Sequence, residues 1–158
     1  MSQTIFQDPL YRSRAEIILE VTFAILVCLA SVLGNVQVVY VVNKYSEMQT
    51  IPNFLIRNLA LTDIIMATLI MPFWITNLYS GKWNFSQEWC EVSSLAQFIM
   101  ALASLFIMGL IALNRYMKVV KPSLYIKFFP GKRVAWLYFG LVWAVSVLVA
   151  TPPLYGWG

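Results

Sequence analysis

Four long apolar stretches occupy most of this 158-residue chain, at about residues 17–43, 54–79, 90–120 and 134–155. A helix needs about 20 mostly apolar residues to cross a bilayer, and the buried helices of soluble proteins are generally shorter. Only 11% of the residues are charged, whereas soluble domains average about 25%. The chain therefore cannot surround four such helices with a polar shell, and the sequence predicts an all-α transmembrane helical bundle.

The connections between the four stretches are short, so successive helices are expected to be antiparallel neighbours in one bundle. Residues 1–16 form a polar tail, and residues 17–158 form the transmembrane domain. The tail lacks a small-residue cleavage site, and the apolar stretch after it is too long for a signal peptide. We expect the first helix to be its own uncleaved insertion signal.

Lysine and arginine predict the orientation, because they collect on the cytoplasmic side of membrane proteins. Eight of them flank or lie in the first and third connections: Lys44, Arg57, Arg115, Lys118, Lys121, Lys127, Lys132 and Arg133. Three others lie with the tail and the second connection. The tail is therefore expected outside the cell. Beside membrane spans, the eight charges are more simply topology signals with a weak attraction to lipid headgroups than a nucleic-acid surface.

Residue types that several enzyme classes need are missing. The chain has no histidine, which excludes histidine bases and histidine metal sites. Its two cysteines, Cys28 and Cys90, cannot build a thiolate zinc site. It also has no glycine-rich phosphate-binding loop. The chain is not expected to be an enzyme.

Three polar residues are predicted at one depth inside the membrane. Asp63 lies on the second span, Asn35 on the first and Ser104 on the third, each roughly 12 to 16 Å from a membrane surface at 1.5 Å per residue. A carboxylate in hydrocarbon costs several kcal/mol, so Asp63 needs partners. We expect the three to form a cluster around water or a small cation, although each could instead be bonded locally.

A series of short motifs resembles the rhodopsin-like (class A) G-protein-coupled receptors over their first four helices. In chain order they are Gly34-Asn35, the Asn-Leu-Ala-Leu-Thr-Asp of residues 58–63, Trp83-Asn84-Phe85, Cys90, Asn114-Arg115-Tyr116, Pro122, Trp143 and Pro152-Pro153. The resemblance rests on their order and spacing. It implies four spans of an expected seven-span receptor fold, a plasma-membrane location and an extracellular N-terminus. The subfamily stays open between opsin-like and melatonin-receptor-like features.

The resemblance implies a signalling role for the cytoplasmic end of the third span. Arg115 would contact a heterotrimeric G protein when the receptor opens, with Asn114, Tyr116 and Pro122 beside it. The family usually has aspartate where this chain has Asn114. Asparagine can hydrogen-bond Arg115 but offers no charge, so we expect more basal signalling than from an Asn114→Asp version. In the same resemblance, Asp63, Asn35 and Ser104 match a sodium pocket, whose other ligands would lie on later helices.

Aromatic and soft residues on the outer halves of the second and third spans suit a ligand pocket, or equally a lipid-interface belt. The candidates are Trp74, Ser93, Gln97 and Met100. Amine receptors carry an aspartate where Gln97 stands, so an amine ligand is disfavoured. A peptide, a lipid and a small neutral ligand stay open. Retinal would be the cofactor only of an opsin, through a lysine on a seventh helix.

Several residues have expected structural roles. In the family, Cys90 bonds a cysteine of the second extracellular loop, and no such cysteine follows in this chain. We therefore expect Cys90 to be a free thiol here or to be cross-linked to another molecule. Asn58 and Trp143 resemble a packing pair between the second and fourth helices. Pro72 and Pro153, with its neighbour Pro152, should kink or end helices, because proline removes an internal hydrogen bond.

The expected partners are a G protein, an extracellular ligand, membrane lipid and a second receptor chain, with no nucleic acid. We expect the chain to be a fragment that does not signal alone, because activation in the family moves a sixth helix. The alternative is a self-contained four-span scaffold or channel subunit. That alternative would not explain why Asn114-Arg115-Tyr116 follows Cys90 at the family spacing.

Overall fold

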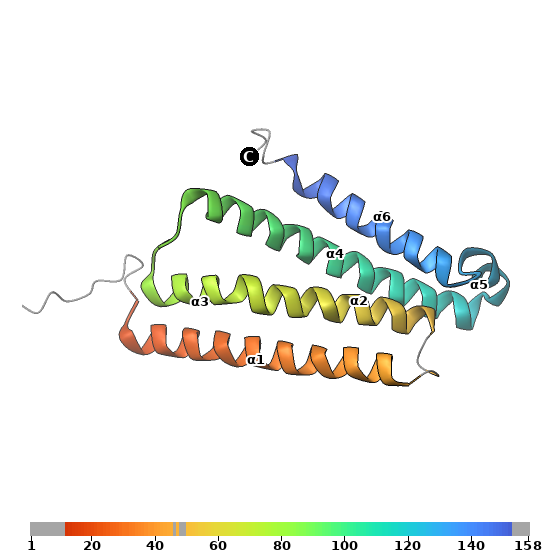
Figure 1. Ribbon diagram of the computed structural model, residues 1–158, viewed down its shortest axis with the longest axis horizontal. Coiled ribbons are helices and arrows are strands. Elements are labelled where there is room, and N and C mark those ends of the chain that lie inside the picture. Colours follow the sequence, from red (N-terminus) through yellow and green to blue (C-terminus); the bar gives the residue numbers. More distant parts are fainter. Residues whose placement is uncertain (1–11, 46, 48–49, 153–158) are drawn as a thin grey trace, which may run out of the picture.

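A computed structural model describes residues 12–45, 47 and 50–152 of the chain, and the regular structure within these ranges is helical. The helices are α1 (Arg14–Lys44), α2 (Ile51–Ile65), the π-helical turn η2 (Met66–Ile70), α3 (Met71–Ser80), α4 (Gln87–Val120), α5 (Pro122–Phe128) and α6 (Lys132–Ala150) (Figure 1). Because α2, η2 and α3 are continuous, the described residues contain four helical segments long and apolar enough to cross a membrane. The predicted all-α transmembrane bundle is confirmed.

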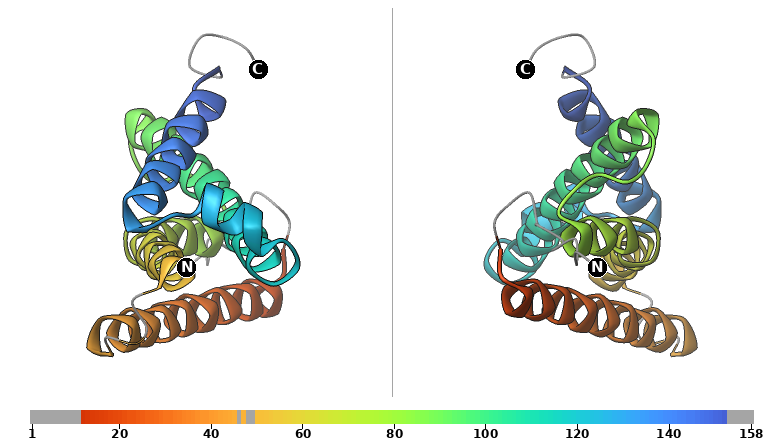
Figure 2. Two further views of the ribbon diagram at one scale, coloured as in Figure 1. Left: turned by 90° about the vertical axis from the view of Figure 1, so that its right-hand side faces the viewer. Right: turned by 90° about the vertical axis from the view of Figure 1, so that its left-hand side faces the viewer.

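The four spans lie side by side, with the second span central (Figures 1 and 2). That span packs against α1 on one side and α4 on the other, and α6 packs on α4 and on α2. We name the two ends of the bundle by their contents. The tail end is where α1 and α4 begin and α3 ends, and the α5 end is where α2, α5 and α6 begin.

Small side chains dominate the helix contacts. Ala60, Ala67, Ala103 and Ala135 are each at most 2% exposed. Association of helices in a membrane depends on close packing rather than on a difference in hydrophobicity, so small residues bring the backbones together. Large apolar residues cover the outside of all four spans. This distribution suits a bundle whose outer surface meets lipid.

Local signals set the helix ends. Ser13 caps α1 in a capping box with Glu16, and Ser86 caps α4 by accepting from the Trp89 backbone N–H. Gly81 ends α3 at φ 67°, a left-handed conformation that glycine adopts without strain. The spans consequently begin two to three residues before the predicted positions. α6 ends at Ala150, and not near residue 155, because Pro152 cannot donate the next helical hydrogen bond.

The second span contains a feature that the sequence did not predict. Pro72 was expected to kink a helix, and the structure places the π-helical turn η2 just before it. The Met71 backbone N–H bonds to the Met66 carbonyl five residues back, so the Ala67 carbonyl loses its usual helical donor. Its π-type donor would be Pro72, which has no N–H. The Cys28 thiol of α1 donates to this carbonyl instead, at 3.2 Å.

Candidate functional site

A candidate binding site is a cavity of about 440 Å³ at the tail end, between α3 and the first turns of α4. Its lining consists of Arg12, Trp74, Asn77, Leu78, Gly81, Lys82, Trp83, Cys90, Ser93 and Ser94. Indole rings supply apolar surface, and amide, hydroxyl and cationic groups lie around them. A concave site of this size with a few polar groups can hold a small ligand or one part of a larger ligand.

The predicted pocket residues do not all occupy the cavity. Trp74 and Ser93 line it. Gln97 does not line the cavity, but its Oε1 accepts a hydrogen bond of 2.6 Å from the Trp74 indole N–H. Met100, three residues further along α4, does not line the cavity. The hydrogen bond between Trp74 and Gln97 joins α3 to α4 beside the cavity. It occupies the amide oxygen of Gln97, which is then less available to a ligand.

Several lining residues were missed by the sequence analysis. Arg12 forms an ion pair with Glu20, and it donates to the Leu78 carbonyl at 2.8 Å. The Asn77 Oδ1 atom is buried and has no hydrogen-bond partner among the described residues. The sequence did contain a signal for Asn77. It is a polar residue on an apolar helix three positions after Trp74, and positions i and i+3 share a helix face.

In the middle of the bundle, the structure brings together two of the three predicted cluster residues. Ser104 of α4 lies close enough to the Asp63 carboxylate of α2 for the two side chains to interact. Asn35 instead donates to the Ser31 carbonyl one turn back in α1, at 2.9 Å. The interhelical pair is therefore present between α2 and α4, and the polar group of α1 is satisfied within its own helix. A sodium ion at Asp63 stays a prediction.

At the α5 end, the Asn114-Arg115-Tyr116 motif splits between two environments. Asn114 is fully buried, and neither atom of its side-chain amide has a hydrogen-bond partner among the described residues. Arg115 and Tyr116 are exposed. Asn114 therefore does not hold Arg115, contrary to the hydrogen bond considered from the sequence. Successive helix positions differ by about 100°, so the two side chains point to different faces.

Pro122 begins a helix that the sequence analysis treated as part of a connection. α5 is only seven residues long and starts with proline, which suits a first helical position. It is held against α6 by aromatic contacts. Phe129 stacks on Tyr125 at 5.6 Å and meets Tyr138 edge-to-face at 5.4 Å. The Tyr138 hydroxyl also donates to the Phe128 carbonyl at 3.0 Å.

The residues with predicted structural roles have mixed outcomes. Cys90 is a free, half-buried thiol at the cavity wall. Asn58 is buried, but it donates to the Phe54 carbonyl of its own helix. The buried Trp143 indole nitrogen has no hydrogen-bond partner among the described residues, so the structure shows no hydrogen bond between Asn58 and Trp143. Pro153 lies outside the described residues.

Comparison with known proteins adds a family. Residues 34–158 match the model of the 7 transmembrane receptor (rhodopsin family). The chain is 32% identical over 90% of its length to "G-protein coupled receptor 161" of Mus musculus, of which it covers 25%. It is 35% identical over 81% of its length to "Compound eye opsin BCRH2" of Hemigrapsus sanguineus, covering 34%. It is 32% identical over 95% of its length to "D(2) dopamine receptor A" of Xenopus laevis, covering 33%.

These matches run along nearly the whole chain but span only a quarter to a third of each of these relatives. The matched proteins are receptors and not enzymes, as the sequence indicated. The identities to the compound eye opsin and to the dopamine receptor are similar, so overall identity does not separate the subfamilies.

Proposed function

The chain belongs to the rhodopsin family of seven-transmembrane receptors, and from this we propose that it forms the ligand-facing and G-protein-facing parts of a receptor for an extracellular signal. The signal is a bound ligand or light, and the cytoplasmic partner is a heterotrimeric G protein. A multi-pass location in the plasma membrane with an extracellular N-terminus accompanies this function. A second receptor chain and membrane lipid are further partners.

One observation carries the proposal: a single straight element, α4, connects the two candidate sites. Ser93 lies buried in the wall of the tail-end cavity, and Arg115 is exposed at the α5 end. The 22 helical steps from Ser93 to Arg115 cover about 33 Å at 1.5 Å per residue, roughly the thickness of the hydrocarbon core. A change at the cavity can thus reach the opposite surface through one rigid helix.

The charge distribution supports the orientation. Lys118, Lys121, Lys127 and Arg133 gather on or around α5 and the start of α6, and all are exposed. This surface faces the cytoplasm under the rule that lysine and arginine stay inside. Arg115 opens onto the same end, and its always-charged guanidinium suits exchange between alternative polar partners.

The cavity chemistry favours a ligand without a strong cation. Gln97 is neutral, and its amide oxygen already accepts from Trp74. Lys82 at the cavity wall would repel an ammonium group. A peptide, a lipid or a small neutral ligand fits these groups better than an amine. The same proposal includes a sodium ion, held by Asp63 with Ser104. It includes retinal as the cofactor only if the receptor is an opsin.

Complementation tests this function. The 158-residue chain is co-expressed with a separate segment carrying the fifth to seventh helices of a matched relative, and ligand-independent nucleotide exchange on the G protein is measured. The pair is expected to reach the cell surface and promote exchange, whereas the chain alone does neither. Arg115→Ala is expected to abolish exchange by the pair, and Arg133→Ala, an equal change of charge at the same end, to preserve it. Exchange that is insensitive to Arg115→Ala, or that the chain promotes alone, would contradict the proposal.

A further inference from the structure

Arg12 joins the chain just before α1 to the end of the second span. Its guanidinium forms an ion pair with Glu20 in the second turn of α1, and it donates a hydrogen bond of 2.8 Å to the Leu78 carbonyl of α3, 66 positions away. Long charged side chains at a membrane surface usually extend into water, but the Arg12 side chain is only 13% exposed. This single side chain therefore connects two helices at the tail end.

The end of α3 suits a cationic partner. The last carbonyls of a helix have no donor within the helix and carry partial negative charge. The Gly81 backbone N–H donates to the Asn77 carbonyl at 2.8 Å, and Arg12 donates to the next carbonyl, that of Leu78. The Glu20 side chain is 45% exposed, so water weakens its ion pair with Arg12. The bond to Leu78 is therefore the stronger of the two interactions.

Arg12 also lines the tail-end cavity. The other lining residues belong to α3, to the connection after it and to α4. Among them is Cys90 in the first turn of α4, whose thiol is free and half-buried. The part of the wall that Arg12 supplies is a side chain held by polar interactions, so it can move without displacing a helix. Cys90 in the same cavity can report such a movement.

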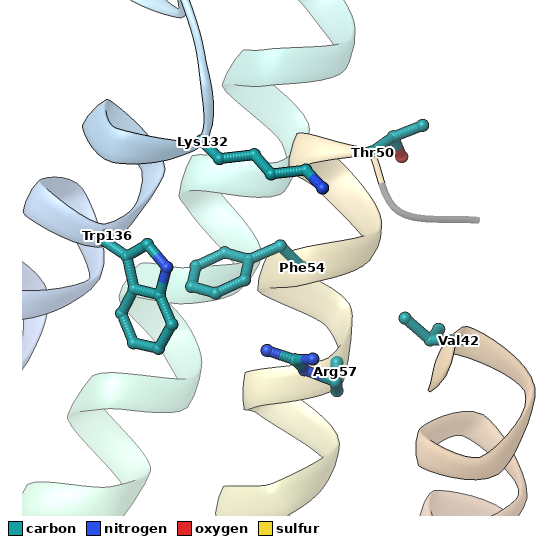
Figure 3. A pocket seen from close by; sticks show the side chains of 6 residues that line it. All are labelled: Val42, Thr50, Phe54, Arg57, Lys132 and Trp136. Carbon is teal, nitrogen blue, oxygen red and sulfur yellow. The ribbon is translucent and has the colours of Figure 1, made fainter. Parts of the chain in front are cut away.

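The opposite end of the bundle offers a comparison. A cavity of about 170 Å³ lies there, lined by Val42, Thr50, Phe54, Arg57, Lys132 and Trp136 (Figure 3). Arg57 of α2 also reaches α1, since it donates to Asn43 Oδ1 at 3.2 Å, and its guanidinium lies 5.5 Å from the centre of the Phe54 ring. An arginine thus connects the second span to α1 or its start at each end of the bundle. Of these two arginines, Arg12 lines the tail-end cavity.

We propose that Arg12 is a latch that controls entry to the tail-end cavity. While it holds Glu20 and Leu78, it closes the side of the cavity next to the start of α1 and limits access to Cys90. When both interactions break, the side chain extends into water and the cavity opens. A ligand of the receptor would then enter past Arg12. This last consequence rests on the proposed function, whereas the closure of the cavity does not.

The test measures how fast Cys90 reacts with N-ethylmaleimide and with the bulkier fluorescein maleimide, in the purified full chain in detergent micelles. Peptide mass spectrometry reports Cys90 and Cys28 separately. Arg12→Ala is expected to raise the reaction rate of Cys90 with the bulky reagent roughly tenfold, the effect of losing one hydrogen bond to a charged group. The small reagent should gain less. Removing a cation does not by itself make a thiol more reactive, so the increase reports access.

Matched variants separate the latch from a general loosening of α1. Arg14→Ala removes the same charge two positions later, and Arg57→Ala removes the connection at the other end of α1. Both should change the Cys90 rate less than about twofold, because neither residue lines the tail-end cavity. Glu20→Gln removes only the exposed interaction and should raise the rate by about twofold to threefold. Arg12→Lys keeps the charge but not the forked guanidinium, and its rate should lie between those of the original chain and Arg12→Ala.

Cys28, further along α1 and bonded to the Ala67 carbonyl, is the internal control. Helicity of every variant is checked by circular dichroism, and Glu20→Gln tests the latch if Arg12→Ala does not fold. Equal increases at Cys28 and Cys90 would mean that the whole bundle loosens, and would overturn the proposal. An unchanged Cys90 rate in Arg12→Ala, an equal increase in Arg57→Ala, or the same increase for both reagents would overturn it too. No ligand or G protein enters this assay, so its failure leaves the receptor function to be judged by complementation.

Discussion

α1 and α4 have similar lengths, 31 and 34 residues, but they differ in how much of their surface other helices cover. α1 has one buried residue, Ile17, whereas α4 has four, Ser93, Ala103, Ile107 and Asn114. Their polar residues differ in the same way, since Asn35 bonds within α1 and Ser104 lies beside Asp63 of α2. Both helices are apolar enough to cross a membrane. Their contacts with other helices differ, and by these contacts α4 is the more central helix of the bundle.

The largest difference between the two helices should come from core truncation. Ile107 of α4 is fully buried, so Ile107→Ala leaves a cavity and should lower the free energy of unfolding by about 2 kcal/mol or more. Leu33→Ala on α1 removes a side chain that is 64% exposed and should cost less than about 0.5 kcal/mol. Denaturation of the micelle-bound chain by sodium dodecyl sulfate, followed by circular dichroism, measures both. Equal losses would show that α4 is no more central than α1.

Polar truncation should give a smaller difference. Ser104→Ala removes the partner of Asp63 and should cost about 1 kcal/mol, a typical value for an interhelical hydrogen bond in a membrane. Asn35→Ala breaks only a bond within one turn and should be nearly neutral. The same denaturation assay applies, with Asp63→Asn completing a double-mutant cycle. Additive effects of Ser104→Ala and Asp63→Asn would mean that the two residues do not interact.

The contact between Cys28 and the π-helical turn offers a third comparison. Cys28→Ala removes the donor to the Ala67 carbonyl and should cost about 0.5 kcal/mol. Cys28→Ser keeps a donor of similar size and should retain the stability of the original chain. The pair separates hydrogen bonding from packing at one position of α1. If the alanine and serine variants are equally stable, the thiol has only a packing role.

Basal signalling should show the smallest effect. The buried amide of Asn114 makes no hydrogen bond to Arg115, so the restraint on Arg115 is weak in this chain. Asn114→Asp introduces a charge that attracts Arg115 and should lower ligand-independent nucleotide exchange in the complemented receptor. Asn114→Leu, which adds no charge, is the matched control. Unchanged or higher exchange with aspartate would refute this role of the residue.

Much of the fold could be predicted because a membrane imposes one simple condition, a long apolar run, on each span. The proximity of Asp63 and Ser104 also followed from their equal depth on adjacent helices. Asn35 could not be assigned by depth, because Ser31 one turn back competes for its amide. α5 escaped prediction because seven residues carry too little periodicity, and its position depends on the aromatic contacts of Phe129. The cavities could not be predicted, because they depend on how the helices pack against one another. In the sequence they are marked only by single residues such as Asn77.

The π-helical turn has a consequence for how this receptor is compared with others. A wide turn accommodates one residue more than an α-helix, so it rotates everything beyond it by about 100°. Met66–Ile70 separates Asp63 from Trp74 and Asn77, so the side chains of α2 keep their direction while those of α3 are rotated. An ungapped alignment with a receptor that lacks the turn would pair Trp74 and Asn77 with residues on another face. A single-residue insertion or deletion in this turn can thus exchange the residues that α3 presents to the tail-end cavity without disturbing α2.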